Sequence, residues 1–295
     1  MQGITFKECG RRYIKSHRAA WTNPKHATQW EATVEQYAYP VIGGLPVDKI
    51  TTGLVLRCIE PNWATKNETM SRVRQRIESI LAWATARGYR PAGENPARWK
   101  GHLDHLLPPK SVQKRGHFTA MPYKGVPAFM ERLRDQPSIP ARSLEFAILT
   151  AARSGEAVGA TWGEIAGDTW TIPGERMKAR RDHIVPLASR TLEIVESLQG
   201  FDETRVFPDI NGDSIRYVLQ KLHPGVTIHG FRSTFRDWAG DCTAFDRETI
   251  EFALAHGITD ATEAAYRRST AIEKRRELMA AWEAFCEGAT KLASC

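Results

Sequence analysis

The chain has 295 residues, enough for two domains, and its 42% hydrophobic and 25% charged residues exclude collagen-like and extensively disordered structure. No stretch approaches the roughly 20 apolar residues that cross a bilayer, and residues 1–7 lack the apolar centre of a signal peptide, so we expect a cytoplasmic protein without a membrane partner. The net charge of +7 resides in residues 1–106, with 16 Lys and Arg against 9 Asp and Glu, which favours a polyanionic partner such as nucleic acid.

Residues 1–106 show helical patterning, because apolar side chains recur at three- and four-residue spacing and are punctuated by Gly and Pro. A long helix is predicted from Asn67 to Gly88. We therefore expect a small all-helical domain. The start of the long helix is basic, and it forms either a solvated face or a surface laid along a DNA backbone. The candidate DNA contacts are Lys66, Arg72, Arg74 and Arg76.

Residues 107–123 are polar, basic and without periodicity, so we interpret them as a linker. Helical patterning dominates residues 124–295, except for two short β-prone runs at 170–173 and 183–187 that flank a charged turn. These runs predict a small β-hairpin among helices. The fold class expected for the whole chain is mainly α with a small antiparallel β-sheet, an all-helical domain being followed by a mixed α/β domain.

Residues 124–295 also contain side chains that suit phosphoryl transfer. That reaction needs cations around the non-bridging phosphate oxygens, an in-line nucleophile, and groups that move protons. Four short segments, at 150–156, 177–181, 229–232 and 254–257, supply Arg, Lys and His, and a tyrosine follows ten residues after the last His. The candidate catalytic residues are Arg153, Lys178, His229, Arg232, His256 and Tyr266. This set can act without a metal or another cofactor.

Each of these residues also has a plain structural explanation when considered alone. Arg153 could form a surface ion pair with Glu156 at i+3 on one helix face. His229 could cap a helix or pack in the core, although its spacing from Arg232 places both side chains on one helix face. A charged turn such as 177–181 is usually just solvated. An isolated tyrosine is usually a packing residue.

Metal and disulfide chemistry have little support in the sequence. The five cysteines are widely spaced and include no Cys-x-x-Cys pair, so we expect neither disulfides nor a cysteine-based zinc site. A zinc site built from His229 and His256 lacks a local pair of ligands. No metal site is therefore predicted.

Taken in order, the segments resemble the tyrosine recombinases, particularly the integrases of phages and genomic islands. The resemblance rests on a Thr-x-x-Arg-x-Gly-Glu segment, a Lys on a hairpin turn, His-x-x-Arg, Leu-x-His and a Tyr about ten residues later, and it covers nearly all of the chain. Residues 21–30 and 95–99 likewise resemble the core-binding domain of the island integrases. The resemblance to the tyrosine recombinases implies a SAM-like core-binding domain over residues 1–106 and a catalytic domain over residues 124–295.

The resemblance implies a phosphate-binding role for four of the residues. Arg153 and Arg232 would clamp the scissile phosphate, since a guanidinium fork matches phosphate oxygens. His229 would contact the phosphate and handle protons, and His256 would donate a hydrogen bond to the same phosphate. Glu156 would orient Arg153 and is not expected to be a catalyst.

The resemblance implies the two covalent roles as well. Tyr266 would attack phosphorus and form a 3′-phosphotyrosine, which conserves the bond energy for resealing. Lys178 would be the general acid that protonates the 5′-hydroxyl leaving group. Arg180 and Arg181 compete with Lys178 for this assignment and are also candidate DNA contacts.

The function implied is that of a site-specific recombinase that cleaves and rejoins DNA strands to integrate or excise a mobile element, either phage-encoded or active at the bacterial nucleoid. Its expected partner is double-stranded DNA carrying core attachment sites. Four protomers would act on two synapsed duplexes through a Holliday junction, with a monomer in free solution. An accessory DNA-bending protein or an excisionase is a further candidate partner.

Two rival functions and two structural questions stay open at this point. A type IB topoisomerase-like nicking and closing enzyme would use the same residue set, and a DNA-binding regulator without catalysis would use the same basic surface. The chain starts almost directly at the core-binding domain, so we expect it to lack the amino-terminal arm-binding domain. The apolar stripe of residues 272–285 would either join the core of its own domain or dock on a neighbouring subunit.

Overall fold

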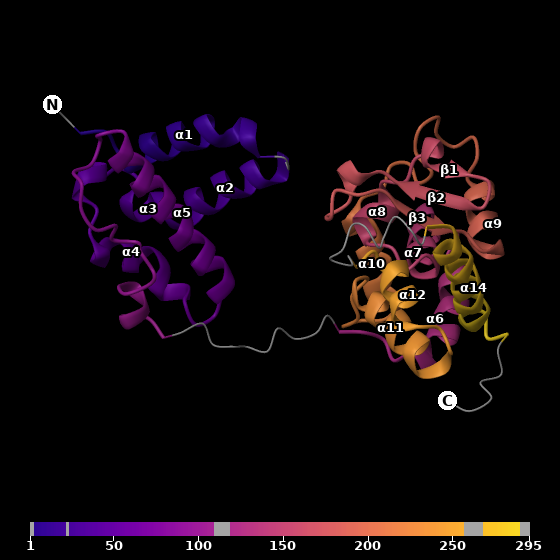
Figure 1. Cartoon of the computed structure of the whole chain (residues 1–295). Coiled ribbons are helices and arrows are strands. Elements are labelled where there is room, and N and C mark those ends of the chain that lie inside the picture. Colours follow the sequence, from indigo (N-terminus) through magenta and orange to yellow (C-terminus); the bar gives the residue numbers. More distant parts are fainter. Residues whose placement is uncertain (1–2, 22–23, 109–118, 257–267, 290–295) are drawn as a thin grey trace. The chain divides into compact units, whose positions relative to one another are not determined.

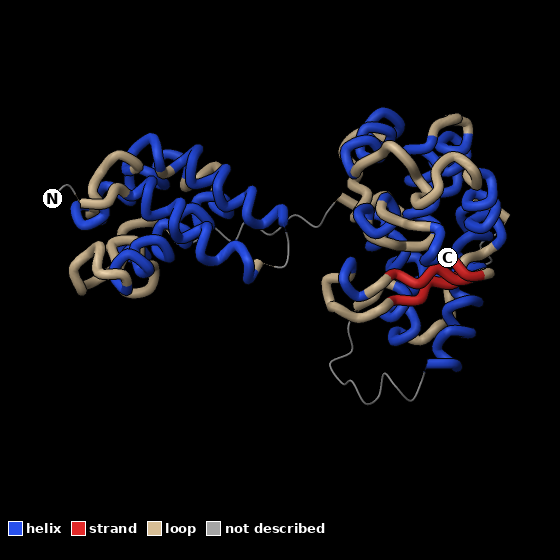
Figure 2. The backbone as a smooth tube through the Cα atoms, turned by 90° about the horizontal axis from the view of Figure 1, so that it is seen from above, coloured by secondary structure: helices blue, strands red, loops and turns tan. Residues whose placement is uncertain are grey.

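The computed structural model describes residues 3–21, 24–108, 119–256 and 268–289, and it divides the chain into two compact units, Met1–Arg115 and Gly116–Cys295 (Figure 1). Each unit has a hydrophobic core of its own. The predicted fold class, mainly α with one small antiparallel sheet, is confirmed (Figure 2). Within the described residues, no helix combines the length and the apolar character needed to cross a membrane.

The first unit is all-helical in its described residues. Its α-helices are α1 (Phe6–His17), α2 (Pro24–Tyr37), α3 (Tyr39–Ile42), α4 (Thr52–Ile59) and α5 (Asn67–Ala86), joined by 3₁₀ turns at Arg18–Ala20, Val47–Lys49, Glu60–Asn62 and Leu103–His105. The longest helix, α5, buries Met70, Val73, Ile77 and Ile80. This three- and four-residue spacing forms one apolar stripe, which explains why the segment is helical and which face it buries.

The second unit surrounds one central helix. Its α-helices are α6 (Val126–Arg134), α7 (Ile139–Leu149), α8 (Ser154–Val158), α9 (Ser189–Ser197), α10 (Gly212–Leu222), α11 (Gly230–Cys242), α12 (Arg247–Ala253) and α14 (Arg268–Cys286), with 3₁₀ turns at Tyr123–Gly125, Trp162–Glu164 and Gly174–Arg176. Every residue of α7 from 143 to 149 is buried. A helix enclosed on all sides is the centre of a core, and α6, α8, α9, α10 and α14 all pack against α7.

A three-stranded antiparallel sheet, with the order β1-β2-β3, completes the second unit. Its strands are β1 (Ile165–Ala166), β2 (Thr169–Ile172) and β3 (His183–Pro186). On β2 the side chains of Trp170 and Ile172 are fully buried and alternate with partly exposed threonines, so one face of the sheet lies on the core. Ile172 pairs with His183, and the β2–β3 connection therefore projects from the end of the sheet at this pair.

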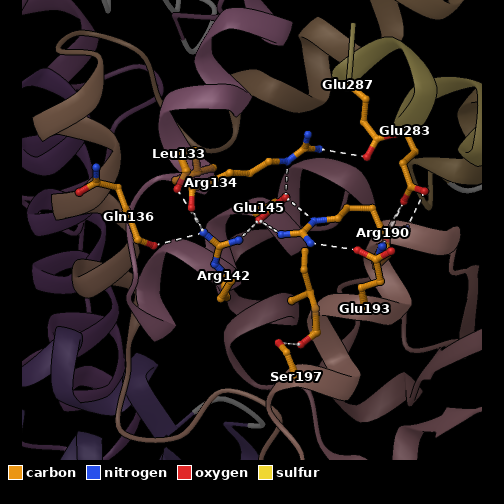
Figure 3. A network of polar contacts seen from close by, with 12 residues as sticks. Leu133, Arg134, Gln136, Arg142, Glu145, Arg190, Glu193, Ser197, Glu283 and Glu287 are labelled. Carbon is orange, nitrogen blue, oxygen red and sulfur yellow. Dashed lines mark hydrogen bonds and ion pairs between the residues drawn. The ribbon is translucent and has the colours of Figure 1, made fainter. Parts of the chain in front are cut away.

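A buried carboxylate joins several helices of the second unit (Figure 3). Glu145 on α7 is fully buried and accepts hydrogen bonds from Arg134 Nε at 2.8 Å, Arg142 Nη1 at 2.6 Å and Arg190 Nε at 3.0 Å. These arginines come from α6, α7 and α9. Because a buried charge is costly unless it is paired and hydrogen-bonded, the three guanidiniums make the burial of Glu145 possible.

The helix α14 packs within its own unit. Trp282 is fully buried and donates from Nε1 to the carbonyl oxygen of Ile148 at 2.9 Å. Glu283 accepts from the backbone N–H groups of Arg190 at 2.8 Å and Thr191 at 3.1 Å, so it caps the amino-terminal end of α9 (Figure 3). Of the two placements left open by the sequence, the structure shows the helix in the core of its own chain.

The cysteines depart in part from expectation. Cys9, Cys58 and Cys286 are free and buried, but Cys242 is disulfide-bonded, contrary to the prediction that the chain would have no disulfide. Burial raises the pKa of Cys9 to about 11 and that of Cys58 to about 12. The thiols of Cys9 and Cys58 therefore stay protonated and belong to the core.

Candidate active site

Arg232, in the first turn of α11, lies between the carboxyl ends of two other helices. It is 5% exposed, and its guanidinium donates from Nη1 to the carbonyl oxygen of Ala151 and from Nη2 to that of Leu254. Ala151 follows the end of α7, and Leu254 is the residue at which α12 ends. A cation is favourable there because the carbonyl ends of helices carry partial negative charge. The two carbonyls hold the guanidinium in one orientation.

Two alanines with left-handed backbone conformation shape these helix ends. Ala151 has a φ of 50°, and Ala255, which directly follows Leu254, has the same value. For a residue with a Cβ this conformation costs about 1–2 kcal/mol, so the surrounding structure must impose it. Each alanine reverses the chain at a helix end and is followed within two residues by a predicted site residue, Arg153 or His256.

Arg153 is held in place by a buried carboxylate. It occupies the position before the first turn of α8, where its Nη1 donates to Glu156 Oε1 at 2.7 Å and its backbone N–H donates to Glu156 Oε2 at 2.8 Å. Glu156 is buried, whereas the Arg153 side chain is 27% exposed. This is not a surface ion pair, since the carboxylate is enclosed and fixes both the backbone and the guanidinium of Arg153.

His256 is oriented by the carboxylate of Glu251, which no sequence motif singled out. Its Nδ1 lies 2.5 Å from Glu251 Oε2, and its Nε2 lies 3.4 Å from Arg232 Nη2. Glu251 also pairs with Arg236 Nε at 2.7 Å. Burial opposes the charge of Glu251, but the bonds of His256 and Arg236 outweigh it and lower the pKa of this carboxyl. Glu251 therefore stays ionised and fixes the ring of His256.

His229 directly precedes α11 and lies within the electrostatic reach of the same groups. Burial lowers the pKa of His229, and the positive charges of Arg232, Arg153 and His256 lower it further. The structure thus brings together four predicted site residues, namely Arg153, His229, Arg232 and His256. Among the described residues, no group of three or more His, Cys, Asp or Glu side chains could hold a metal ion.

Gly230 allows α11 to begin where it does. A Cβ at this position would lie 2.4 Å from the carbonyl oxygen of Thr119, closer than any side chain could approach. The same carbonyl accepts a hydrogen bond from Thr227 N–H at 3.1 Å. Glycine at 230 therefore permits the backbone contact that seats the helix carrying Arg232.

Lys178 lies in the turn between β2 and β3. Lys178, Arg180 and Arg181 are all exposed, while the neighbouring Met177 is buried and anchors the turn. Tyr266 lies outside the described residues.

The candidate DNA contacts on α5 divide into two pairs. Arg76 is 7% exposed, donates to the carbonyl oxygen of Gln29 at 2.6 Å and stacks 5.2 Å from the centre of the Trp30 ring. Arg74 pairs with Glu78 and donates to a backbone carbonyl. Both arginines therefore contribute to the unit's own packing, and their contact with DNA stays a prediction.

Lys66 and Arg72 are the other pair on the same basic segment. Both are exposed, although the Lys66 ammonium lies 5.9 Å from the centre of the Tyr37 ring and Arg72 pairs with Glu68 at 3.2 Å. These contacts are on the surface, where such pairs are weak and can be exchanged for phosphate. Lys66 and Arg72 stay predictions.

Known proteins with similar sequences and folds are integrases. The family model "Phage integrase central domain" matches residues 6–102. Prophage integrase IntZ of Escherichia coli K12 is 26% identical over 288 residues, covering 93% of this chain and 69% of the relative. Prophage integrase IntA of the same strain is 29% identical over 266 residues, covering 85% of this chain and 62% of the relative, so this chain spans about two thirds of their lengths.

The fold comparison extends over both units. A crystal structure of a lambda integrase tetramer bound to a Holliday junction matches with a TM-score of 0.69 and 13% sequence identity. The match covers 88% of this chain and 80% of the lambda integrase chain. At this identity the likeness concerns the fold.

Proposed function

We propose that the chain is a tyrosine recombinase of the phage integrase family, which its similarity to the phage integrase central domain and to prophage integrases supports, and that it cleaves and rejoins DNA strands at specific sites through a 3′-phosphotyrosyl intermediate. The observation that carries the proposal is the grouping of Arg153, His229, Arg232 and His256, which come from three separate segments. The positive charges of Arg153 and Arg232 repel each other within this group. An anionic phosphate at their centre would relieve that repulsion.

The two guanidiniums are prepared for a phosphate before it arrives. Arg232 is held by the carbonyls of Ala151 and Leu254, and Arg153 is held by Glu156. Burial, followed by the charge of Arg153, lowers the pKa of Arg232 to about 10, so Arg232 is still charged at neutral pH. Because neither guanidinium has to be reoriented when a phosphate binds, little free energy is lost to reorganisation. Both can therefore stabilise the charge that develops in the transition state.

The two histidines have different surroundings and are proposed to have different tasks. Glu251 binds Nδ1 of His256 and fixes the ring, so Nε2 is the atom that would contact a phosphate oxygen. The lowered pKa of His229 keeps that ring neutral at pH 7, so it can accept a proton as well as donate one. This supports phosphate contact for His256 and proton handling for His229.

The covalent steps are assigned to Tyr266 and Lys178 on the strength of the family motif. The Tyr266 oxygen would attack phosphorus, forming the 3′-phosphotyrosine while the bond to the 5′-oxygen breaks. Lys178, on the exposed β2–β3 turn, would give its proton to that oxygen. Attack by the freed 5′-hydroxyl would later reverse both steps and release Tyr266, so no nucleotide cofactor is required.

The proposed partner is double-stranded DNA with core attachment sites, bound by the basic first unit and by the catalytic unit. The lambda integrase structure contains a tetramer on a Holliday junction, and we propose the same assembly here, with four protomers on two synapsed duplexes and a monomer in free solution. An accessory DNA-bending protein or an excisionase would act on this assembly. Phosphate contacts would supply most of the affinity and make it salt-dependent.

The proposal is tested with a nicked suicide substrate built on the native site. That site is obtained by sequencing DNA trapped covalently on the protein in its host. The wild-type chain is expected to leave a denaturation-resistant protein–DNA adduct, and Tyr266→Phe none. Binding without an adduct in the wild type would instead indicate a DNA-binding regulator. Relaxation of a supercoiled plasmid that lacks the site would indicate a topoisomerase-like enzyme.

A further inference from the structure

Arg176 lies in the β2–β3 connection, two residues before Lys178 and outside the motifs found in the sequence. Its guanidinium makes two contacts beyond that connection. Nη1 donates to the carboxylate of Glu164, and Nη2 donates to the backbone carbonyl oxygen of Glu156 on α8. The Arg176 side chain is 24% exposed and that of Glu164 is 10% exposed, so water reaches their ion pair only in part. The connection that carries Lys178 is therefore joined to the helix that Arg153 directly precedes.

The carboxylate that receives Arg176 is itself held in place. Glu164 ends the 3₁₀ turn before β1, and its Oε2 accepts a hydrogen bond from the indole Nε1 of Trp170 at 2.9 Å. Trp170 lies on β2 and is fully buried in the core of the unit. An acceptor anchored to the core gives the charge-assisted bond from Arg176 one defined position. The ion pair therefore determines where the Arg176 guanidinium lies.

Gly159, directly after α8, leaves the space that this guanidinium occupies. A Cβ at position 159 would lie 2.8 Å from Arg176 Nη2 and 3.3 Å from its Cζ. The φ of −91° at Gly159 lies in a range open to residues with a Cβ. The reason for a glycine here is therefore the room that it leaves for Arg176. This close approach is a second, independent sign that the connection docks on the end of α8.

The anchor at Arg176 also restricts the backbone of Lys178. The backbone N–H of Arg180 donates to the carbonyl oxygen of Met177 at 3.2 Å, so Lys178 lies inside a four-residue turn that begins directly after Arg176. Met177 is 4% exposed, whereas Lys178 is exposed. Two adjacent side chains, one bonded to α8 and one buried in the core, thus hold the start of the turn. The Lys178 ammonium extends from a fixed base.

We propose that Arg176 is a positioning residue for the proposed cleavage reaction, holding the turn that carries Lys178 against α8, where Glu156 orients Arg153. The inference rests on the proposed function, because it concerns the placement of the general acid relative to a phosphate-binding arginine. In this role Arg176 contacts neither the phosphate nor the leaving group. It limits the positions open to Lys178, and such pre-organisation raises the rate of the chemical step rather than the affinity for DNA.

The test uses two substitutions that act on the same contact in different ways. Arg176→Met removes both bonds, but it also leaves the Glu164 carboxylate without its counter-ion, which destabilises the fold. Gly159→Ala keeps the arginine and displaces its guanidinium by the added Cβ. The control is Arg216→Met, which removes an arginine from an exposed ion pair with Asp213 on α10. Thermal unfolding temperatures define the conditions under which all four chains are folded.

Each chain is given two nicked suicide substrates at saturating DNA, one with the normal bridging 5′-oxygen and one with sulfur in its place. Thiols have a pKa of about 8.5, so the sulfur leaves as a thiolate and needs no proton from Lys178. The single-turnover rate of adduct formation is measured on each substrate, together with the Kd for the DNA. The ratio of the two rates reports on the general acid alone.

Arg176→Met and Gly159→Ala are expected to slow cleavage of the oxygen substrate on the order of 10- to 100-fold, because misplacing a reacting group by about 1 Å has effects of this size. Both variants should cleave the sulfur substrate at close to the wild-type rate. Their Kd for DNA should stay at the wild-type value, since the phosphate-binding arginines keep their own partners. Arg216→Met should match the wild type on both substrates.

Other results separate failure of this inference from failure of the proposed function. Equal slowing on the two substrates would overturn the positioning role, since Arg176 would then act on the phosphate clamp or on the fold as a whole. Wild-type rates in both folded variants would also overturn it and leave the recombinase proposal intact. Absence of any adduct from the wild-type chain on either substrate would overturn the proposed function, and the positioning role with it.

Discussion

The guanidinium of Arg232 donates to the carbonyl oxygen of Ala151, an alanine held at a φ of 50° two residues after the end of α7. The contact joins residues 81 positions apart, and it makes the orientation of a proposed catalytic arginine depend on the turn that precedes Arg153. A change in that turn would therefore be felt by both guanidiniums. The equivalent contact with Leu254 connects Arg232 to the turn that precedes His256.

The left-handed turns predict an unusual response to glycine. Ala255→Gly is expected to raise the free energy of unfolding by about 0.5–1 kcal/mol, because relief of about 1–2 kcal/mol of backbone strain exceeds the entropic cost of glycine. Ala280→Gly, in the right-handed interior of α14, is the control and should lower it by about 1 kcal/mol. Urea unfolding measures both. A destabilised Ala255→Gly would mean that the turn carries no strain.

The Glu145 cluster predicts a large loss of stability from a small change. Glu145→Gln leaves Arg134, Arg142 and Arg190 facing a neutral group, and we expect a loss of about 3–5 kcal/mol in the free energy of unfolding. Glu193→Gln is the control, since Glu193 pairs with Arg190 but is 62% exposed, and it should cost less than about 1 kcal/mol. If both variants lost similar free energies of unfolding, burial of the Glu145 carboxylate would not be the cause of the larger loss.

The competition between Lys178, Arg180 and Arg181 is resolved with a substrate whose leaving group needs no proton. A bridging 5′-sulfur leaves as a thiolate, and thiols have a pKa near 8.5, far below that of an alcohol. Lys178→Ala should therefore cleave normal DNA slowly, by about 10²–10⁴-fold, and recover on the sulfur substrate. Arg180→Ala and Arg181→Ala should show no such selective recovery. Recovery in an arginine variant instead would transfer the general-acid role to that residue.

Burial lowers the pKa of His183 to about 4, which predicts an acid-sensitive contribution to stability. The unfolded chain takes up a proton at its ordinary value of 6.5 and the folded chain only at about 4, so the unfolded state binds more protons between these values. The contribution of His183 to the free energy of unfolding is therefore complete above pH 6.5. It falls by up to about 3 kcal/mol as the pH drops towards 4.

Urea unfolding at pH 7 and pH 4.5 measures this contribution. His229, whose pKa is also lowered, acts in the same direction in every variant, so the relevant quantity is the difference between wild type and His183→Gln. The variant should lose less stability on acidification. An identical loss in both chains would show that His183 is not held neutral.

The two pairs of basic residues on α5 should behave differently in DNA binding. Arg72→Ala is expected to reduce the slope of log Kd against log salt by about 1, since one phosphate contact is lost. Arg76→Ala should leave that slope unchanged and lower the free energy of unfolding by about 1–3 kcal/mol, because the carbonyl of Gln29 loses its partner. A change in salt slope for Arg76→Ala would place this arginine on the DNA.

Much of the architecture could be read from local patterns in the sequence. The spacing of Met70, Val73, Ile77 and Ile80 predicts α5, and the β-prone runs around Trp170 and Val185 predict the hairpin, because helix and strand periodicities are properties of neighbouring residues. The order and spacing of Arg153, His229, Arg232 and His256 likewise pointed to phosphoryl transfer, since each motif is short.

What the tertiary structure decided was which polar groups are enclosed and what each one contacts. Arg72 and Arg76 are one helical turn apart and alike in sequence, yet the first is exposed and the second is buried against Trp30. The carbonyls of Ala151 and Leu254 had no signal of their own, because their partner, Arg232, comes from a distant segment. Side-chain chemistry is local and was determined by the sequence alone, whereas burial and hydrogen-bond partners depend on packing between elements, which only the folded chain defines.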